Sequence, residues 1–493
     1  MQRASETSGI GEPAKDAHEA QDTPDRRERS PWRALLPTSR RDLLLALAFG
    51  VGIAAVWLHA AGPGAGAGYD FFGAYYTAGR DVAAGISPYH QLAKLTTDAQ
   101  SGGVHGTGYV YPPLLALLLS LPIRLGFDAR GVWLLWTLLT VAVVLWMGYE
   151  LNRHLRDSRS WSGALAFALA SLLPAIVIYD LSLGQADVLL AALAVCACGL
   201  WLRGNRWSAG ITLGAAIAIK PTLALLLLVW LWKGDWRTTW RGAAAALALV
   251  AGPFALLGPG ALQQYVAFFV RWNAFSANAD IINQTPYAFL LRAFTANTAT
   301  PPLIVAPWLV WPLRLALLIG AALLWLRAVP RRRESHLLEM SSCLLALPLI
   351  LLLSPLAEDI HFTLLAPALA GLSWVAWRVL TPGSPSKEDG RADVATRLAG
   401  WALWAALLVS YLPRMQELIY PNHLFAFPGQ NDPHIGPLVT LLRSGALLWL
   451  AVVTLAAGQA VVRAARCPHP QPLPRARERE AEETSPSAAI HEL

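Results

Sequence analysis

The stretch GVWLLWTLLTVAVVLWMGYE, residues 131–150, decides the fold of this chain. It carries no charge before its last residue, and its length of about 20 residues is what an α-helix needs to cross the core of a bilayer. Similar apolar runs recur between residues 42 and 463, and the whole chain of 493 residues is 55% hydrophobic and only 14% charged. These runs predict an all-α polytopic membrane protein. They exclude a soluble enzyme, a secreted disulfide-stabilised domain and a barrel of short alternating strands.

The net charge of +7 is spread over the loops between the apolar runs and does not form a nucleic-acid-binding patch. Because cytoplasmic loops of membrane proteins are rich in Lys and Arg, we expect every basic cluster on the cytoplasmic side. The clusters lie in residues 1–41, 153–159, 203–206, 233–241, 327–333, 378–397 and 463–479. This arrangement predicts both termini in the cytoplasm, and no nucleic acid as a partner.

The charge rule predicts about twelve transmembrane helices. Two of them are short helices within residues 207–232, where Lys220 and Pro221 interrupt the apolar run. Proline lacks a backbone N–H and disfavours helix at the preceding residue, so the two short helices are expected to meet at a tip on the outer side. The other predicted spans are 42–59, 131–150, 161–179, 185–202, 242–257, 305–326, 336–354, 361–379, 398–412 and 435–462.

The chain is predicted to form one membrane domain, residues 41–465, between two cytoplasmic tails. The tails, residues 1–40 and 466–493, are polar and Pro-rich, and we expect them to be disordered. A cleaved signal peptide is not expected, because the first apolar run follows about 40 polar residues. The first outer loop, residues 61–130, is predicted to hold an interfacial helix at 70–85 and an apolar segment, 112–127, at the outer leaflet. The cytoplasmic loops are short, so function is expected on the outer face.

Two charged residues are the first candidates for chemistry. Asp70 lies between aromatic residues at a predicted membrane boundary, where a carboxylate can act as a base toward a hydroxyl; capping the interfacial helix is an equally good interpretation. Lys220 is an intramembrane charge, which indicates a functional site, and it could bind an anion such as a lipid phosphate. A lysine that snorkels to the interface is the alternative.

Further polar groups fall on the same predicted side. Gln185 lies in the turn Leu183-Gly184-Gln185-Ala186-Asp187, and Glu358, Asp359 and His361 lie in the turn 354–361. The second turn could bind a metal or sugar hydroxyls, or it could be a solvated connection. Tyr111, Asn283 and Gln284 are aromatic and amide groups of the kind that contact sugars. By contrast, Cys196 and Cys198 lie two residues apart in one apolar run, which favours core packing over a disulfide or a zinc site.

Several ordered motifs resemble those of the family-87 glycosyltransferases, polytopic enzymes of the GT-C superfamily. They are Asp70-x4-Tyr75-Tyr76-x-Ala78-Gly79-Arg80, Ser87-Pro88-Tyr89, Tyr111-Pro112-Pro113-Leu114, Leu183-Gly184-Gln185, Ala209-Gly210-x3-Gly214-x5-Lys220-Pro221, Asn283-Gln284 and Leu353-Ser354-Pro355 with His361. The chain departs from the family pattern at Thr285, where serine is usual. It also has Glu358 and Phe362 near the Ser-Pro turn, where the family often has an aromatic residue and a second histidine.

The resemblance implies transfer of a sugar, most often mannose and in some members arabinofuranose. The donor is a polyprenyl monophosphate sugar, and the acceptor is a glycolipid or glycan outside the cytoplasmic membrane. Asp70 would be the catalytic base of an inverting reaction, and Lys220 and Arg80 would stabilise the leaving phosphate. Gln185 and His361 would orient sugar or phosphate oxygens, and Tyr111 would pack on the prenyl chain or the sugar. Tyr75, Asn283, Gln284 and Glu358 complete the predicted substrate site; neither a metal nor a cofactor is expected.

Two other classes of function remain open on the residues alone. A transporter or flippase of lipid-linked sugars would also have about twelve spans and a broken helix pair. However, the chain shows no second copy of the Lys220–Pro221 break, whereas such transporters are often built from repeats. A scaffold that binds lipid-linked glycan without turnover is the third possibility, and the intact Asp70 argues against it. The basic tails favour contact with anionic membrane lipids.

Overall fold

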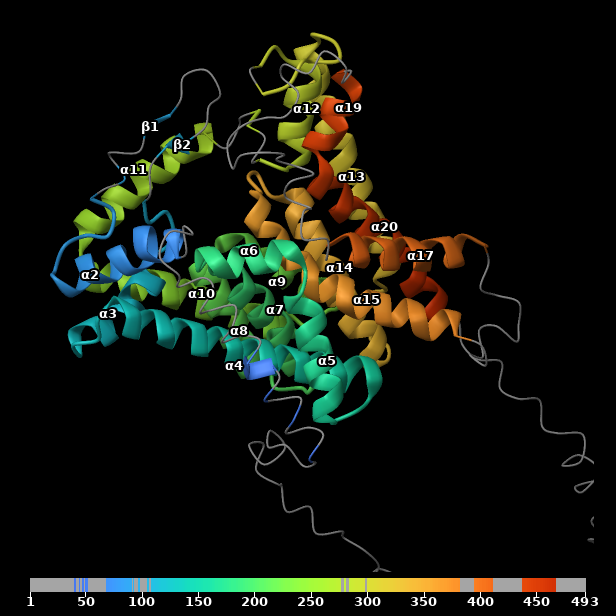
Figure 1. Ribbon diagram of the computed structural model, residues 1–493, viewed down its shortest axis with the longest axis horizontal. Coiled ribbons are helices and arrows are strands. Elements are labelled where there is room, and N and C mark those ends of the chain that lie inside the picture. Colours follow the sequence, from blue (N-terminus) through green and yellow to red (C-terminus); the bar gives the residue numbers. More distant parts are fainter. Residues whose placement is uncertain are drawn as a thin grey trace, which may run out of the picture.

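The computed structural model of the protein is a bundle of α-helices (Figure 1). It describes residues 68–90, 108–275, 283–297, 299–381, 394–410 and 437–466, with a few short pieces outside these ranges. In this part of the chain the only strands are β1 (Thr96–Thr97) and β2 (Val104–His105), which pair antiparallel. The all-α class is therefore confirmed. The first predicted span, 42–59, and the two predicted tails lie largely outside the described residues.

The helices follow one another closely along the chain. In the first half they are η2 (a π-helix, Phe71–Tyr76), α2 (Thr77–Ala83), α3 (Leu114–Arg124), α4 (Ala129–Arg156), α5 (Trp161–Leu172), α6 (Ala175–Leu183), α7 (Asp187–Leu202), α8 (Arg206–Ile219), η4 (Pro221–Ala224), α9 (Leu225–Trp232) and α10 (Trp236–Leu257). In the second half they are α11 (Pro259–Phe275), α12 (Pro286–Phe294), η5 (Pro307–Leu309), α13 (Val310–Ala328), α14 (His336–Leu353), η6 (Asp359–Leu364), α15 (Leu365–Leu380), α17 (Val394–Ser410), α19 (Pro437–Ser444) and α20 (Ala446–Arg466).

Six helices of the described part are long and apolar enough to cross a membrane, which makes this a multi-pass membrane protein. They are Ala129–Arg156, Trp236–Leu257, Pro307–Ala328, His336–Leu353, Ile360–Leu380 and Ala446–Arg466. Five shorter apolar helices accompany them, among them the pair on either side of Lys220. The number of twelve spans stays a prediction, because length and composition do not decide which of the short helices cross.

The span predicted at 161–179 is not one continuous helix, and whether the segment crosses the membrane stays a prediction. The structure breaks it into α5 and α6, which are bent by 79° relative to each other. The break lies at Leu173 and Pro174, where the proline has no N–H to continue the helix and its ring disfavours helix at the residue before it. As a result, α6 runs across the end of the bundle and brings its C-terminal turn toward η6, against which it packs.

The other predicted break is confirmed. α8 ends at Ile219, Lys220 is extended with φ −137° and ψ 104°, and Pro221 opens the 3-10 turn η4 that leads into α9. The helix predicted at 70–85 is also present as η2 and α2, and the apolar segment predicted at 112–127 contains α3. Their location at the membrane interface stays a prediction. The last predicted span, 435–462, divides at Gly445 into α19 and α20.

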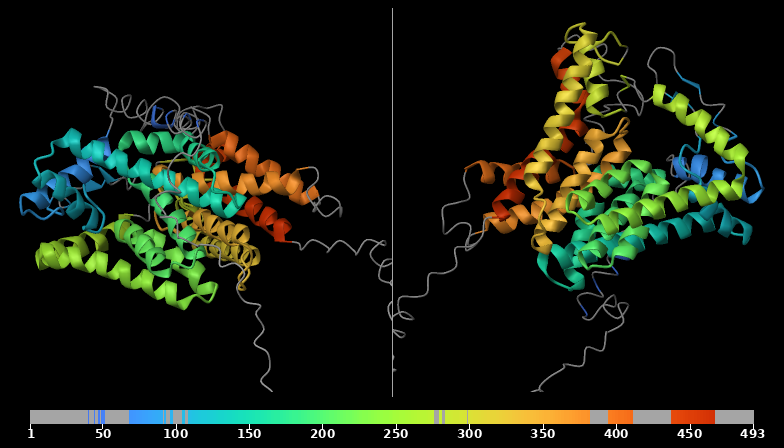
Figure 2. Two further views of the ribbon diagram at one scale, coloured as in Figure 1. Left: turned by 90° about the horizontal axis from the view of Figure 1, so that it is seen from below. Right: turned by 180° about the vertical axis from the view of Figure 1, so that it is seen from behind.

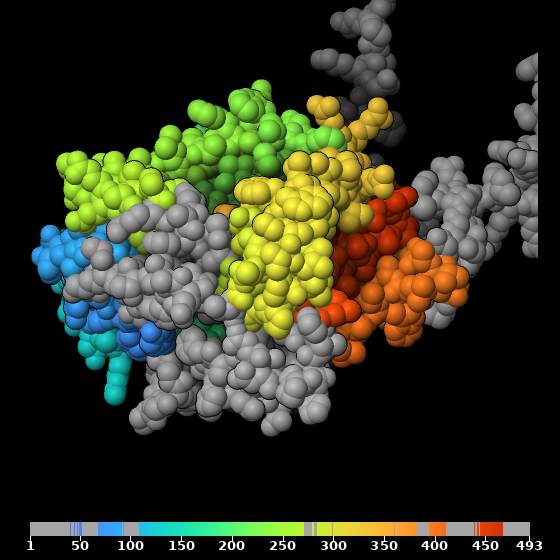
Figure 3. Space-filling model, turned by 90° about the horizontal axis from the view of Figure 1, so that it is seen from above, coloured from blue at the N-terminus to red at the C-terminus, as the bar shows by residue number. Residues whose placement is uncertain are grey.

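The most deeply buried helices are α7, α14 and α15. Against α7 pack α4 and α8, and against α15 pack α5 and α20 (Figure 2). Cys196, Cys198 and Cys343 are buried there as free thiols, in agreement with the predicted role as small core residues. The segment 68–90 and α3 lie together at one edge, and α11 runs beside them. Seen from above, α11 and this segment lie on one side and α12 and α13 on the other (Figure 3).

Close contact of α4 with α5 depends on small residues. A Cβ at Gly148 would lie 2.2 Å from the backbone carbonyl oxygen of Ala164, and backbone cannot move aside as a flexible side chain could. Gly148→Val is therefore expected to destabilise the protein by about 1–3 kcal/mol through overpacking. Thermal unfolding of the detergent-purified protein measures this as a lowered Tm. Gly320→Val on α13 is the matched control, since nothing lies within 4 Å of its Cβ position, and an equal effect of both variants would contradict the packing argument.

Candidate active site

The turn between α6 and α7 positions the residues of a cluster of polar side chains. Gly184 ends α6 in the left-handed region, with φ +72°, and the backbone N–H of Gln185 donates to the carbonyl of Asp180. A Cβ at Gly184 would lie 2.3 Å from the ring of Trp133 and 2.6 Å from Cβ of Phe71. Glycine is therefore required both by the backbone conformation and by the lack of space. Through this close approach the turn is held against η2.

Asp70 immediately precedes η2 and lies beside that turn. The backbone N–H of Gly68 donates to the carbonyl of Ser182 in α6 at 2.7 Å, which ties the start of the segment to the turn. Asp70 has helical φ and ψ, and its side chain makes no capping hydrogen bond. The structure thus gives no support to the helix-capping interpretation. Instead, the carboxylate of Asp70 accepts a hydrogen bond from the side-chain amide of Gln185.

A chain of hydrogen bonds orients that amide. The hydroxyl of Tyr75 donates to Oε1 of Gln185, which leaves the NH₂ group of Gln185 to face Asp70. The phenols of Tyr75 and Tyr111 share a further hydrogen bond, and their rings lie 5.6 Å apart. Burial raises the pKa of Tyr111 to about 12, although the nearby Lys220 cation opposes the rise. Both phenols therefore stay protonated at neutral pH and act as fixed hydrogen-bonding groups.

The environment of Asp70 favours a basic carboxylate. Burial raises the pKa of Asp70 above its usual value of 3.8, and the negative charge of Asp187 acts in the same direction. The hydrogen bond from Gln185 and the positive charge of Lys220 oppose this rise. A carboxylate with a raised pKa accepts a proton more readily than an exposed one, which is the property that a general base needs.

Lys220 forms the central ion pair of the cluster. Its Nζ donates to both carboxylate oxygens of Asp187, the first residue of α7, at 2.8 and 2.9 Å. The ammonium group also lies 5.4 Å from the centre of the Tyr111 ring. An ammonium has three N–H donors, so the contacts with Asp187 leave one for a bound ligand. The side chains of both partners are about nine-tenths buried or more.

Asp180, in the last turns of α6, is fully buried next to this pair. Its Oδ2 accepts the backbone N–H of Val188 at 3.2 Å and thereby satisfies one of the open donors at the N-terminus of α7. Its Oδ1 has no hydrogen-bond partner among the described residues. Asp180 thus holds the start of α7, and with it the position of Asp187.

The turn before η6 brings two further predicted residues to the cluster. The backbone N–H of Glu358 donates to Nδ1 of His361 at 3.2 Å, and the backbone N–H of His361 donates back to the carbonyl of Glu358 at 3.0 Å. His361 interacts electrostatically with Lys220 and Asp187. Glu358 interacts in the same way with Lys220. This turn therefore belongs to the cluster, and η6, which follows it, packs against α6 and α7.

Asn283 and Gln284 support that turn. The backbone N–H of Gln284 donates to the carbonyl of Ala357, and its side-chain amide donates to the carbonyl of Ser444, both at 2.8 Å. Asn283 accepts the backbone N–H of Thr285 through Oδ1 at 3.2 Å and is almost fully buried. These contacts attach the start of α12 to the turn and to the end of α19. They identify a positioning role for both residues.

The structure does not bring Arg80 into the cluster. Its side chain is 60% exposed and lies 3.9 Å from Asp81, on the surface of α2. The other predicted residues that the structure gathers are Asp70, Tyr75, Tyr111, Gln185, Lys220, Glu358 and His361. Among the described residues, no three His, Cys, Asp or Glu side chains are placed to hold a metal ion, and metal-free catalysis stays a prediction.

Two residues of the site had no predicted role. Asp180 was not named from the sequence, and Asp187 was named only as part of the turn around Gln185. The signal that could have found them is the cost of an intramembrane cation, because a buried lysine requires a counter-ion from a neighbouring helix. Asp180 and Asp187 lie on either side of the Gly184 turn, at the ends of two apolar runs, and are the acids of those runs. Which of the two acids pairs with Lys220 depends on the bend of the chain at Pro174.

The helices and this cluster define a multi-pass membrane protein with a candidate active site at the ends of its helices. The sequence model of glycosyltransferase family 87 matches residues 109–355, half of the chain, and the protein belongs to this family. The family predicted from the sequence motifs is thereby confirmed.

Two relatives carry the name polyprenol-phosphate-mannose-dependent alpha-(1-2)-phosphatidylinositol mannoside mannosyltransferase. The protein from Mycobacterium tuberculosis is 27% identical over 285 residues, which are 55% of this chain and 63% of the relative. The protein from Mycolicibacterium smegmatis is 29% identical over 159 residues, which are 30% of this chain and 36% of the relative. The matched regions thus span less than two thirds of either relative.

Crystal structures of ArnT from Cupriavidus metallidurans, bound to undecaprenyl phosphate and in the apo state, are similar to this chain with a TM-score of 0.40. Their sequence identities are 18% and 16%, and each match covers 85% of this chain and 77% of ArnT.

Removal of one partner of the central ion pair is expected to destabilise the protein. Asp187→Asn leaves the Lys220 ammonium buried without its counter-charge, at a cost of about 3–5 kcal/mol; Lys220→Met has a similar cost through the unpaired carboxylate. The double variant should recover much of this loss, because neither charge then remains. Thermal or denaturant unfolding of the four proteins measures the coupling. Arg80→Gln, which removes an exposed charge, is the control and should stay close to wild type; additive losses in the double variant would contradict the pairing.

Proposed function

We propose that this protein is a membrane glycosyltransferase of the polyprenyl-phosphate-sugar-dependent type. It moves a sugar, with mannose as the first candidate, to a hydroxyl group of a glycolipid or glycan acceptor on the outer side of the cytoplasmic membrane. The observation that carries the proposal is the Asp70 carboxylate, which is held by Gln185 beside a buried lysine. Membership of family 87 and the names of the two relatives support the choice of donor.

In the proposed mechanism Asp70 takes the proton of the acceptor hydroxyl. The hydroxyl oxygen then attacks the anomeric carbon of the sugar from the face opposite the phosphate. The bond from the anomeric carbon to the phosphate oxygen breaks, and the electron pair leaves with the phosphate, so the configuration at that carbon inverts. One base and a cation near the leaving oxygen are sufficient, because a phosphate is already a stable leaving group.

The remaining groups of the cluster have assigned tasks in this mechanism. The third N–H of Lys220 binds the departing phosphate, while Asp187 keeps the ammonium in position. His361, fixed through Nδ1 by the backbone of Glu358, orients an oxygen of the sugar or phosphate. Tyr111, whose ring lies beside Lys220, packs on the sugar or on the first part of the prenyl chain. Arg80 has no task in it, because its side chain lies on the surface of α2.

Loss of the base tests the proposal most directly. Asp70→Asn is expected to lower transfer from polyprenyl-phosphate-mannose to a lipid extract by about 100- to 10,000-fold, since this is what general-base catalysis contributes. The assay uses protein in nanodiscs and radiolabelled donor, and the product's anomeric configuration is read by NMR. Asp81→Asn is the matched control, because Asp81 is a buried aspartate of the neighbouring helix that pairs with His90. If Asp70→Asn transfers as fast as wild type, the proposed base is wrong.

The pH dependence of transfer gives a second test. Asp70 must be ionised to act, so activity should fall as the pH drops through its raised pKa, and the acid limb should lie above the usual 3.8. The hydrogen bond from Gln185 lowers that pKa, so Gln185→Leu should move the acid limb to higher pH. Tyr75→Phe keeps the Gln185 donor and should move the limb less. An unchanged limb in Gln185→Leu would show that another group titrates.

A further inference from the structure

An apolar groove runs along the bundle between α9, α13 and α14, apart from the polar cluster. It has a volume of about 540 Å³ and is lined almost entirely by leucine, isoleucine, valine, alanine and tryptophan side chains. It is open to the side, since Leu228 and Leu231, which line it, are 53% and 45% exposed. In a membrane protein such a surface faces lipid chains. The groove is therefore a place where a chain can lie along the protein.

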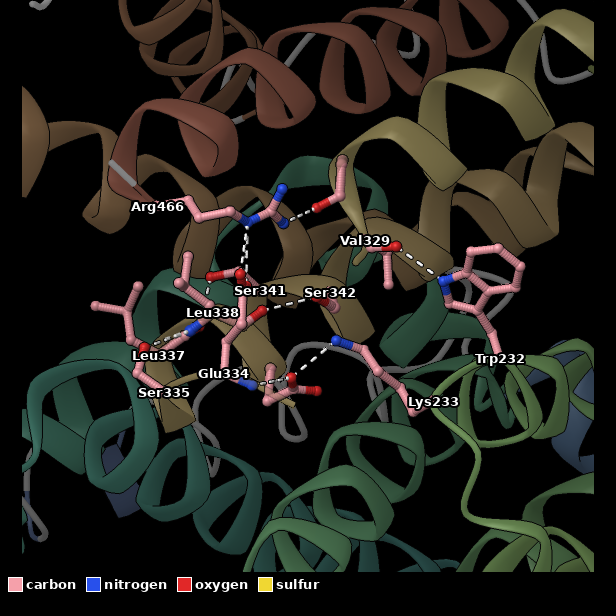
Figure 4. Close-up of polar contacts among 12 residues, drawn as sticks. Trp232, Lys233, Val329, Glu334, Ser335, Leu337, Leu338, Ser341, Ser342 and Arg466 are labelled. Carbon is pink, nitrogen blue, oxygen red and sulfur yellow. Dashed lines mark hydrogen bonds and ion pairs between the residues drawn. The ribbon is translucent and has the colours of Figure 1, made fainter. Parts of the chain in front are cut away.

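One residue of the lining is charged, and it defines a polar end. Arg331 follows α13 and lines the groove near the C-terminal end of α9, where Trp232 Nε1 donates to the carbonyl of Val329 at 2.8 Å (Figure 4). The opposite end of the groove is formed by Leu225 and Leu353, which lead toward Lys220 and the turn of Glu358. The polar end is thus remote from the candidate active site.

The acidic side chains around this polar end are already paired with other cations. Lys233 donates to Glu339 at 2.8 Å, and Arg466 contacts Glu334 at 2.9 Å (Figure 4). Arg333 contacts Asp235 at 2.6 Å. Neither Arg331 nor Arg332 forms an ion pair within the described part of the chain. Within these described ranges, the guanidinium that lines the groove thus has no protein counter-charge.

A guanidinium at one end of an otherwise apolar groove matches the two parts of an anionic phospholipid. The phosphate of such a lipid is negatively charged, and its acyl chains are apolar.

The dimensions agree with one leaflet. The eight residues of α9 and the groove-lining part of α14, from Ala346 to Leu353, are each about 12 Å long. Half of a hydrocarbon core of about 30 Å is about 15 Å. The groove therefore accommodates one acyl chain over most of the depth of a single leaflet, with its headgroup at the basic end.

We propose that this groove is a binding site for an anionic phospholipid, with the phosphate on Arg331 and one acyl chain along α9 and α14. The prenyl chain of a donor fits the groove less well. If the donor phosphate were bound at Lys220 and its prenyl chain lay along the groove, the apolar far end of that chain would lie next to Arg331. The proposal is independent of the proposed transfer reaction, because it concerns the opposite end of the bundle.

Native mass spectrometry of the purified full-length protein with phosphatidylglycerol and phosphatidylcholine tests the site. Wild type should retain one phosphatidylglycerol with about fivefold preference over phosphatidylcholine, as expected for one basic contact. Arg331→Gln should abolish the preference, and Arg332→Gln, whose side chain does not line the groove, should keep it. Ala322→Phe, which fills the groove, should lower retention of both lipids. Ala316→Phe, on the exposed face of the same helix, should not.

Three outcomes would overturn the proposal. Equal losses in Arg331→Gln and Arg332→Gln would show a diffuse charge effect and no site. Unchanged retention in Ala322→Phe would show that the lipid binds elsewhere. Displacement of phosphatidylglycerol, one molecule for one, by added polyprenyl phosphate would instead assign the groove to the donor's chain. Each variant's thermal unfolding in the absence of added lipid verifies that it is folded.

Discussion

The structure depends on one requirement: the ammonium of Lys220, buried among apolar helices, needs a carboxylate. An unpaired charge in such surroundings costs several kcal/mol, and Asp187 supplies both of its oxygens. For this contact the helix must stop at Ile219 and α7 must begin at Asp187. The proline after Lys220 and the glycine three residues before Asp187 are the local features that permit both. The pair thus connects two breaks that are far apart in the sequence.

The position of Asp70 follows from the same turn. Because Gly184 has no side chain, Phe71 and Trp133 can pack directly on the turn, and η2 is held beside Gln185. Tyr75 donates to the side-chain oxygen of Gln185, so that the NH₂ group of Gln185 faces Asp70. The orientation of this amide thus affects the basicity of Asp70, because its hydrogen bond lowers the pKa that burial raises. Asp187 and Lys220 act on Asp70 with opposite signs, so the ion pair also moderates the charge that the base experiences.

Much of this architecture could be predicted from the sequence, and the failures have clear physical causes. Apolar length and the Lys220–Pro221 pair predicted the helices and the central break, because both are local properties of the chain. Pro174 is an equally local signal, but the run around it is so apolar that it was interpreted as one span. The counter-ion Asp187 was missed as a site residue, since the choice of partner depends on tertiary structure. Arg80 matches the motif, yet the helical surface of α2 turns its side chain outward.

The short helix α9 shows how the two ends of the bundle are related. Lys220 lies just before η4 and pairs with Asp187 of α7, whereas Lys233 directly follows α9 and pairs with Glu339 of α14. A buried lysine with a carboxylate on a neighbouring helix therefore fixes each end of this segment. Movement of α9 along its axis would break both ion pairs. The two pairs therefore fix the axial position of α9 relative to α7 and α14. Its outer surface, which has no such constraint, is left as one wall of the apolar groove.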